Sequence, residues 1–256
     1  MLQTLEVAYG PQTAVVWFNR PDRSNALDST AISELHQVLD GLATDPDVQA
    51  VVLAGQGTSF CAGLDLEWLP RASGQDLEQA AALLATIQHY AKPILARVHG
   101  ICAGMGMAIA AAATMTVVAR DSQFMHPGTR TGIAPEISAP YIAAAIGKRT
   151  AQRWLLTGDT MDAAEAWRLG LAHELCEIDE LDARVNQLLG SLMRAAPSAV
   201  RSTLELLRTD ITSQDPNSQA RRLAVSLGGA DALAGLAASR SGQQPPWVER
   251  LLQQAQ

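Results

Sequence analysis

Two short segments rich in small residues could stabilise negative charge through their main chain. They read GTSFCAGLDL at residues 57–66 and HGICAGMGM at residues 99–107. Each follows an apolar run, 51–54 or 94–98, that is typical of a buried strand. We expect each turn to lead into a helix, where unpaired N–H groups and the helix dipole favour an anion. Two such turns aimed at one point would form an oxyanion hole, in which each donor stabilises a developing enolate by ~3 kcal/mol.

Neither turn has the spacing of a nucleotide-binding loop. The sequence around them contains neither the G-x-G-x-x-G pattern of dinucleotide sites nor a Walker loop. A single glycine-containing turn after a strand is most often only a turn. The functional interpretation therefore depends on the pair, and on the elements that bring the two turns together.

The N-terminal half alternates β-rich runs with helical patterns. We predict strands over residues 14–18, 48–54, 94–98 and 115–119. We predict helices after an N-cap at Asp28 and over residues 77–90, 105–113, 151–156, 163–169, 181–194 and 199–208. Residues 212–218 are interpreted as a polar loop. This alternation predicts an α/β fold with right-handed connections, divided into a core over 1–195 and a helical region over 196–256.

Composition narrows the class of protein. The 256 residues are 48% apolar and 18% charged, which is enough for a sizeable core. The net charge of −7, without a Lys/Arg run, argues against nucleic acid as a partner. Three cysteines give neither a disulfide framework nor a metal motif, and we interpret Cys61 and Cys102 as small buried hydrophobes. The start lacks a signal-peptide pattern and the longest apolar stretch is too short for a membrane span, so we expect a cytoplasmic protein.

Together with other segments, the two turns resemble the oxyanion-hole motifs of the crotonase superfamily, the enoyl-CoA hydratase/isomerase family. The motif segments are FCAGLD at 60–65 and GICAGMG at 100–106, preceded by KPILARVHG at 92–100. NRPDRSNAL at 19–27 is similar to the family's segment that contacts coenzyme A. LLTG, AAEA and GLAH, within residues 155–173, are similar to its later helices. The resemblance covers residues 17–176 in the family's order.

The resemblance implies a spiral of ββα units with a helical C-terminal trimerisation region. It implies an acyl-CoA substrate and a homotrimer or hexamer. No separate cofactor or metal is implied, because the thioester itself accepts the electrons. By position, the two oxyanion amides fall on Leu64 and Met105. The path of coenzyme A would be lined by Arg23, Ala26, Ala62, Leu64, Asp65 and Leu66. Arg23 is a candidate for the phosphates, and its alternative is a solvated loop charge.

The acid–base groups depart from the hydratase pattern. Hydratases of the family use two glutamates, and those positions fall on Ala108 and Gly128, neither of which can transfer a proton. Glu136 lies where isomerase-type members and a related dehalogenase carry a carboxylate. We expect burial beside the acyl chain to suit Glu136 to proton transfer, and its alternative is a cap at a helix start. His126 is the other catalytic candidate, with a structural histidine as its alternative.

These residues predict a double-bond isomerisation in which Glu136 moves a proton between carbons of the acyl chain. One alternative is hydration or hydrolysis with other residues, His126 with a bound water among them. The region after Gly132 also resembles methylglutaconyl-CoA hydratases, which points to ancestry more than to reaction. Another is a non-catalytic acyl-CoA-binding protein, which the losses at Ala108 and Gly128 favour. A third is a hydrolase of the same fold that does not use coenzyme A.

Overall fold

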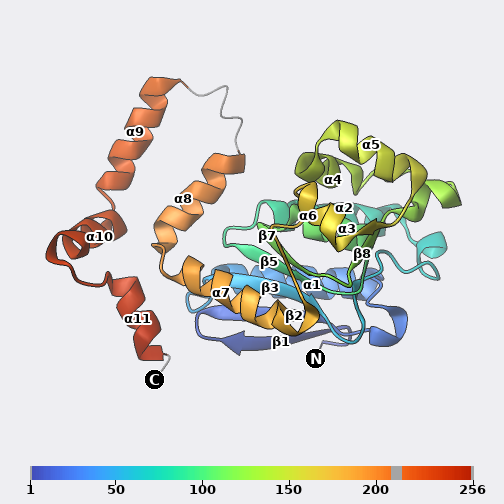
Figure 1. The fold of residues 1–256 in the computed structure, drawn as a ribbon, viewed down its shortest axis with the longest axis horizontal. Helices are drawn as coiled ribbons and strands as arrows, with labels where there is room; N and C mark the ends of the chain where they lie inside the picture. Colours follow the sequence, from blue (N-terminus) through green and yellow to red (C-terminus); the bar gives the residue numbers. More distant parts are fainter. Residues whose placement is uncertain (1, 209–214, 255–256) are drawn as a thin grey trace.

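The computed structural model describes residues 2–208 and 215–254 and contains two β-sheets with helices packed around them (Figure 1). The larger sheet has six strands in the order β1-β2-β3-β5-β7-β10. β1 and β2 form an antiparallel hairpin, and the other neighbours are parallel. The strands are β1 Leu5–Gly10, β2 Thr13–Phe18, β3 Ala50–Gly55, β5 Ile94–Val98, β7 Met115–Ala119 and β10 Glu174–Cys176.

The smaller sheet has four short strands in the order β4-β6-β8-β9. They are β4 Ser59–Cys61, β6 Ile101–Ala103, β8 Gln123–Met125 and β9 Met161–Asp162. β4, β6 and β8 each come directly after a strand of the larger sheet and run parallel to one another. The chain therefore steps from the large sheet to the small one three times, which confirms the predicted spiral of ββα units.

Helices cover both faces of the larger sheet. Val51 and Leu53 of β3 belong to the main core with α1, α2 and α3, whereas Ala50 and Val52 face α7. This alternation follows from the pleat, and burial of both faces is typical of a parallel sheet. The helices are α1 Ser29–Thr44, α2 Gly74–Gln88, α3 Met105–Ala112, α4 Ala139–Ile146, α5 Lys148–Thr157, α6 Ala163–Arg168 and α7 Leu181–Met193. Asp28 caps α1 as predicted, accepting a hydrogen bond from the Ala31 amide.

The C-terminal helices extend away from the sheets, coloured orange to red in Figure 1. They are α8 Pro197–Arg208, α9 Pro216–Leu227, α10 Ala230–Ser241 and α11 Pro246–Gln254. α11 returns to α7, where the Trp247 indole N–H donates to the Arg194 carbonyl at 2.9 Å. The predicted boundary at residue 195 falls between α7 and α8, and a separate domain there stays a prediction. Across the described residues, no helix has both the length and the apolar character to cross a membrane.

The predicted loop over residues 212–218 is wrong in its last part. Residues 212–214 lie outside the described residues, and α9 already begins at Pro216. Asp215 caps this helix by accepting hydrogen bonds from the Asn217 and Ser218 amides. A polar run that contains proline is also typical of the start of a helix, because proline is favoured in the first helical turn.

Candidate functional site

The two small-residue turns contact each other backbone to backbone. Gly63 has φ +97°, and a Cβ placed on it would lie 2.8 Å from the Ala103 carbonyl oxygen and 3.1 Å from the Met105 nitrogen. A Cβ on Gly106 would lie 2.3 Å from the Cys61 carbonyl oxygen. Only glycine fits at such distances. The structure therefore brings together the two motifs that the sequence singled out.

The second turn leads into a helix, as predicted. Gly104 precedes α3 with φ 52° and ψ −116°, and Met105 is the first helical residue. The Gly104 amide donates to the Met125 carbonyl at 2.9 Å, which fixes the turn against β8. The Met105 amide belongs to the first turn of α3, where N–H groups have no partner inside the helix.

The first turn is held differently from what we predicted. No helix follows Leu64 directly in the described chain, and α2 begins only at Gly74. Instead, the Leu27 amide donates to the Gly63 carbonyl at 2.7 Å, and the Asp65 amide donates to the Leu27 carbonyl at 2.9 Å. In a trans peptide the C=O of residue 63 and the N–H of residue 64 point in opposite directions. The bridge therefore directs the Leu64 N–H away from Leu27. Unlike the Met105 amide, the Leu64 amide does not lie at the start of a helix.

Among the described residues, the amides of Leu64 and Met105 take no part in the hydrogen bonds that hold the two turns. Within the part of the chain that the structure describes, neither the Leu64 nor the Met105 N–H donates a hydrogen bond to another group. Met105 is buried and Leu64 is partly buried. Two unpaired amides on adjoining turns are the donors that a developing oxyanion requires.

The N-terminal segment of residues 20–28 packs along the first turn. Asn25 is buried with φ +57°, and its side-chain amide donates to the Gln56 and Ser59 carbonyls. The Ala62 amide donates to the Ser24 carbonyl at 2.9 Å. This packing places Ala26 beside the turn that contains Ala62 and Asp65.

Two of the predicted coenzyme A contacts lie on the surface. Leu66 is exposed, and so is Arg23, whose guanidinium forms a 2.6 Å ion pair with the Glu67 carboxylate. Glu67 raises the pKa of Arg23, through a hydrogen bond and its charge, so the guanidinium stays cationic. A phosphate contact of Arg23 stays a prediction, and it would compete with Glu67.

His126 is buried beside the second turn. Its exposed fraction is 9%, and its Nδ1 has no hydrogen-bond partner among the described residues. It follows Met125, whose carbonyl accepts from Gly104, so the imidazole is one residue from the contact that anchors the Met105 turn. Burial lowers the pKa of His126 below its usual 6.5, which makes the neutral imidazole the form present at pH 7. An unpaired buried polar atom costs ~1–3 kcal/mol, and a bound ligand could relieve that cost.

The two positions that carry glutamate in hydratases are buried or crowded here. Ala108 is fully buried in α3. A Cβ on Gly128 would lie 2.7 Å from the Ile133 carbonyl oxygen and 3.3 Å from the His126 Cε1. The imidazole therefore lies against the place where the second hydratase carboxylate would begin.

Glu136 lies in a turn before α4, and its carboxylate is exposed. Our prediction that Glu136 begins the helix is wrong, because α4 starts at Ala139 after Ser138. Pro140 is the reason, since proline is accepted in the first helical turn and not further in. We also predicted that this carboxylate would be buried, and that prediction is wrong for the single chain, in which Glu136 is exposed.

The cysteines next to the turns are buried, as interpreted from the sequence. Cys61 and Cys102 are fully buried and are register partners on β4 and β6. Burial raises the pKa of Cys61 to about 12 and raises the pKa of Cys102 as well. Both therefore remain thiols at neutral pH, and neither is activated as a nucleophile.

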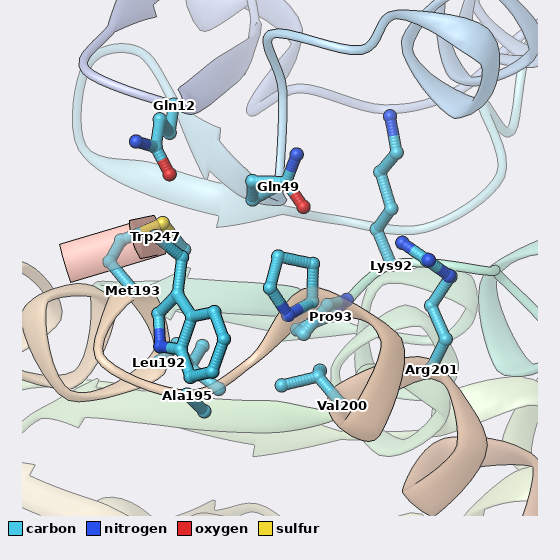
Figure 2. Close-up of a pocket in the computed structure, with 11 residues that line it drawn as sticks. Gln12, Gln49, Lys92, Pro93, Leu192, Met193, Ala195, Val200, Arg201 and Trp247 are labelled. Atoms are coloured by element: carbon cyan, nitrogen blue, oxygen red, sulfur yellow. The ribbon is translucent and has the colours of Figure 1, made fainter. Parts of the chain in front are cut away.

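A cavity lies away from the turns, between the sheet and the C-terminal helices. Figure 2 shows Gln12 and Gln49 on one side, with Met193 and Trp247 on the other. The other lining residues are Lys92, Pro93, Leu192, Ala195, Pro197, Val200 and Arg201. None of these residues was predicted to take part in chemistry.

Two histidines, the buried His126 and the more exposed His173, should make stability depend on pH. Burial lowers the pKa of both His126 and His173, so between these lowered values and 6.5 the unfolded chain binds more protons. The free energy of unfolding should therefore fall as pH drops below 6.5, by at most about 1.4 kcal/mol per pH unit for His126 and by less for the more exposed, solvent-screened His173. Urea unfolding at pH 7.5, 6.5 and 5.5 measures this slope.

The double variant His126→Gln/His173→Gln should flatten that slope. Carboxylates such as Asp65, whose pKa is lowered, lose their contribution only at more acidic pH, so they do not interfere. The same slope in the variant and the natural protein would contradict the assignment to these imidazoles.

The two sheets, the ββα spiral and the paired turns define a class of α/β protein built from repeated ββα units. The profile of the enoyl-CoA hydratase/isomerase family matches residues 11–228, and the chain belongs to this family. It is therefore an acyl-CoA enzyme of the hydratase/isomerase family.

Similar proteins and a solved structure support this family assignment. A putative enoyl-CoA hydratase of Thermus thermophilus is 31% identical over 201 residues, which cover 76% of this chain and 79% of the relative. Mevalonyl-coenzyme A hydratase sidH of Aspergillus fumigatus is 31% identical over 200 residues, covering 76% and 74%. The solved structure of Pseudomonas aeruginosa AtuE superimposes with a TM-score of 0.91 and 31% identity, covering 96% of this chain and 99% of that one.

Proposed function

We propose that this enzyme moves a double bond within an acyl-CoA through a thioester enolate held by the Leu64 and Met105 amides. The contact between the two turns carries this proposal, since a Cβ on Gly63 would lie only 3.1 Å from the Met105 nitrogen. The thioester oxygen would accept both N–H groups, which acidifies the α- and γ-carbons. Glu136 would then take a proton from one carbon and return it to the other.

The substrate is proposed to arrive as a coenzyme A thioester without a further cofactor. Ala26, Ala62, Asp65 and Leu66 lie on the two segments that the N-terminal bridge holds together, and Arg23 lies at their exposed edge. This grouping supports a path for coenzyme A along the first turn. The relatives named as hydratases of CoA thioesters support the same substrate class.

Hydration is the second candidate, and the unpaired Nδ1 of His126 favours it. The imidazole is neutral, buried and next to Gly128, so it could accept a proton from water where hydratases use a glutamate. Hydration would leave Glu136 without a direct role, in agreement with its exposure in this chain.

Two conservative variants separate these reactions. If isomerisation is correct, Glu136→Gln should lower turnover of 3-enoyl-CoA by about 10²–10⁴-fold, the usual contribution of a general acid–base group. His126→Gln should then change it little. If hydration is correct, His126→Gln should abolish the product that is heavier by one water, seen by mass spectrometry with 2-enoyl-CoA.

Glu78→Gln is the matched control, because Glu78 is an exposed glutamate on α2. Full isomerase activity in Glu136→Gln would overturn the proposed role of Glu136. Binding of acyl-CoA in calorimetry without turnover of any of these substrates would support a non-catalytic acyl-CoA-binding protein instead. Turnover of esters that lack coenzyme A would support a CoA-independent hydrolase.

Assembly as a homotrimer or hexamer in the cytoplasm stays a prediction. The exposed leucines of the C-terminal helices support an assembly, because large apolar side chains in such numbers usually face a partner surface. They are Leu206, Leu207, Leu223, Leu227, Leu233 and Leu236.

A further inference from the structure

We propose that Arg20 is a positioning residue, which holds the Leu64 amide in place by tying Asp65 to the N-terminal segment. This inference rests on the proposed function of the Leu64 amide and deepens it. The resemblance made Arg23 the candidate in this segment. In the structure it is Arg20 that contacts Ala26, Asp28 and Asp65.

The Arg20 guanidinium binds three acceptors at once. Nη1 donates to the Ala26 carbonyl at 2.6 Å, while Nη2 donates to Asp65 Oδ2 at 3.1 Å and lies 3.2 Å from Asp28 Oδ2. Its side chain is 20% exposed, that of Asp65 9% and that of Asp28 23%. A planar fork of N–H groups suits such a set of acceptors, whereas a lysine ammonium cannot reach all three in the same geometry.

Asp65 is a carboxylate that depends on this partner. Burial raises the pKa of Asp65, but hydrogen bonds from the Glu67 amide and from Arg20 outweigh it and lower the pKa overall. The group is therefore ionised at neutral pH. Without the guanidinium, a nearly buried negative charge would keep only the Glu67 and Trp68 amides and would face Asp28 unshielded.

The backbone transmits the position of Asp65 to Leu64. The Asp65 amide donates to the Leu27 carbonyl, and the Leu27 amide donates to the Gly63 carbonyl, so the bridge to Leu27 holds Leu64 from both sides. Ala26, which also binds Arg20, is the neighbour of Leu27. If Asp65 moves toward water, the peptide between residues 63 and 64 can rotate, and its N–H then no longer points toward the oxyanion position. A site of this kind tolerates an error of only about 0.5 Å or 10–20°.

Arg23 contrasts with Arg20 on each of these points. It is exposed, and its ion pair is with Glu67, which is also exposed. Ion pairs between exposed side chains contribute little to stability, because water screens both charges. The more buried guanidinium, bound to a carbonyl and two carboxylates, is the better candidate for holding the turn.

The test compares Arg20→Gln, Asp65→Asn and Asp28→Asn in the full chain. Hydrogen exchange of the Leu27 and Asp65 amides, followed by mass spectrometry, reports on the bridge without any substrate. We expect exchange to rise by about tenfold or more in Arg20→Gln and Asp65→Asn, as for a lost hydrogen bond to a charged group. Asp28→Asn should raise exchange less than the other two variants, because Asp28 contacts Arg20 but lies outside the bridge, and asparagine still caps α1.

Kinetics then connect the bridge to the site. Arg20→Gln and Asp65→Asn should lower kcat for acyl-CoA turnover by about tenfold or more, with a smaller change in KM, as for an interaction felt mainly in the transition state. A role in stability alone would lower the melting temperature and leave kcat per folded molecule unchanged. Should Arg20→Gln fail to fold, Asp65→Asn decides the matter.

Exchange of the two amides at the natural rate in both variants would overturn the proposal, as would an equal effect of Asp28→Asn. If the natural protein turns over no acyl-CoA, the proposed function fails, while the exchange result still decides whether Arg20 holds the turn. Raised exchange together with unchanged kcat would show that Arg20 holds the turn without positioning a catalytic amide, and would also overturn the proposal.

Discussion

Replacing Met105 by proline should lower kcat for acyl-CoA turnover by about 10²–10³-fold, the effect of removing one oxyanion donor. Proline has no N–H, so the substitution removes the proposed donor itself. Met105 is the first residue of α3, where proline is well accepted. Gly104 has φ 52° and ψ −116°, the mirror image of an extended residue, which only glycine adopts readily and which leaves room for a following proline.

Met105→Leu is the matched control for this experiment. It keeps the amide and nearly the volume of the buried side chain, so it should cost less than about 1.5 kcal/mol of stability and little kcat. Circular dichroism at the assay temperature confirms that both variants are folded. Natural kcat in a folded Met105→Pro enzyme would show that this amide does not stabilise the transition state.

Sequence patterns predicted the second turn better than the first. The run 94–98, the small residues and the helix from Met105 are consecutive in the chain, so local rules placed the Met105 amide at a helix start. The direction of the Leu64 N–H is set by the bridge to Leu27. This residue lies 37 positions earlier and pairs with the turn only in the folded chain. A local pattern contains no information on such a bridge, and the predicted helix after the first turn was wrong for this reason.

The small sheet escaped prediction for a related reason. β4, β6 and β8 are three residues long, which is too short for an alternating pattern to be recognised. Their pairing nevertheless sets the distance between the two turns, since Cys61 and Cys102 are register partners. By contrast, the cap at Asp28 and the strand Ile94–Val98 were predicted at their observed positions, because their signals are local.

The acid–base groups were also only partly predictable from the sequence. The resemblance to the family placed the two hydratase glutamates on Ala108 and Gly128 and an isomerase carboxylate on Glu136, and no structure was needed for that. The burial of His126 and the exposure of Glu136 depend on the path of residues 127–138 between β8 and α4, which a local pattern does not fix. The family resemblance ranked Glu136 above His126, whereas the unpaired Nδ1 gives His126 more weight than its residue type did.

The variant Gly106→Ala should disrupt the contact between the two turns. Its Cβ would lie 2.3 Å from the Cys61 carbonyl oxygen and 2.9 Å from the Cys61 Cβ, and these atoms can move only if β4 and the first turn move with them. Alanine is otherwise the better helix residue by up to about 1 kcal/mol, so the clash decides the sign. We expect the free energy of unfolding to fall by about 1–3 kcal/mol, the usual cost of overpacking.

Activity should fall further than stability in Gly106→Ala, because displacement of the first turn separates the Leu64 and Met105 amides. Gly190→Ala in α7 is the control, since a Cβ there meets no heavy atom of the described residues within 4 Å. It should raise the free energy of unfolding by about 0.5–1 kcal/mol and leave kcat unchanged. Urea unfolding and kcat per folded molecule measure the two effects. A Gly106→Ala enzyme with natural kcat would mean that the close approach of the turns serves packing alone.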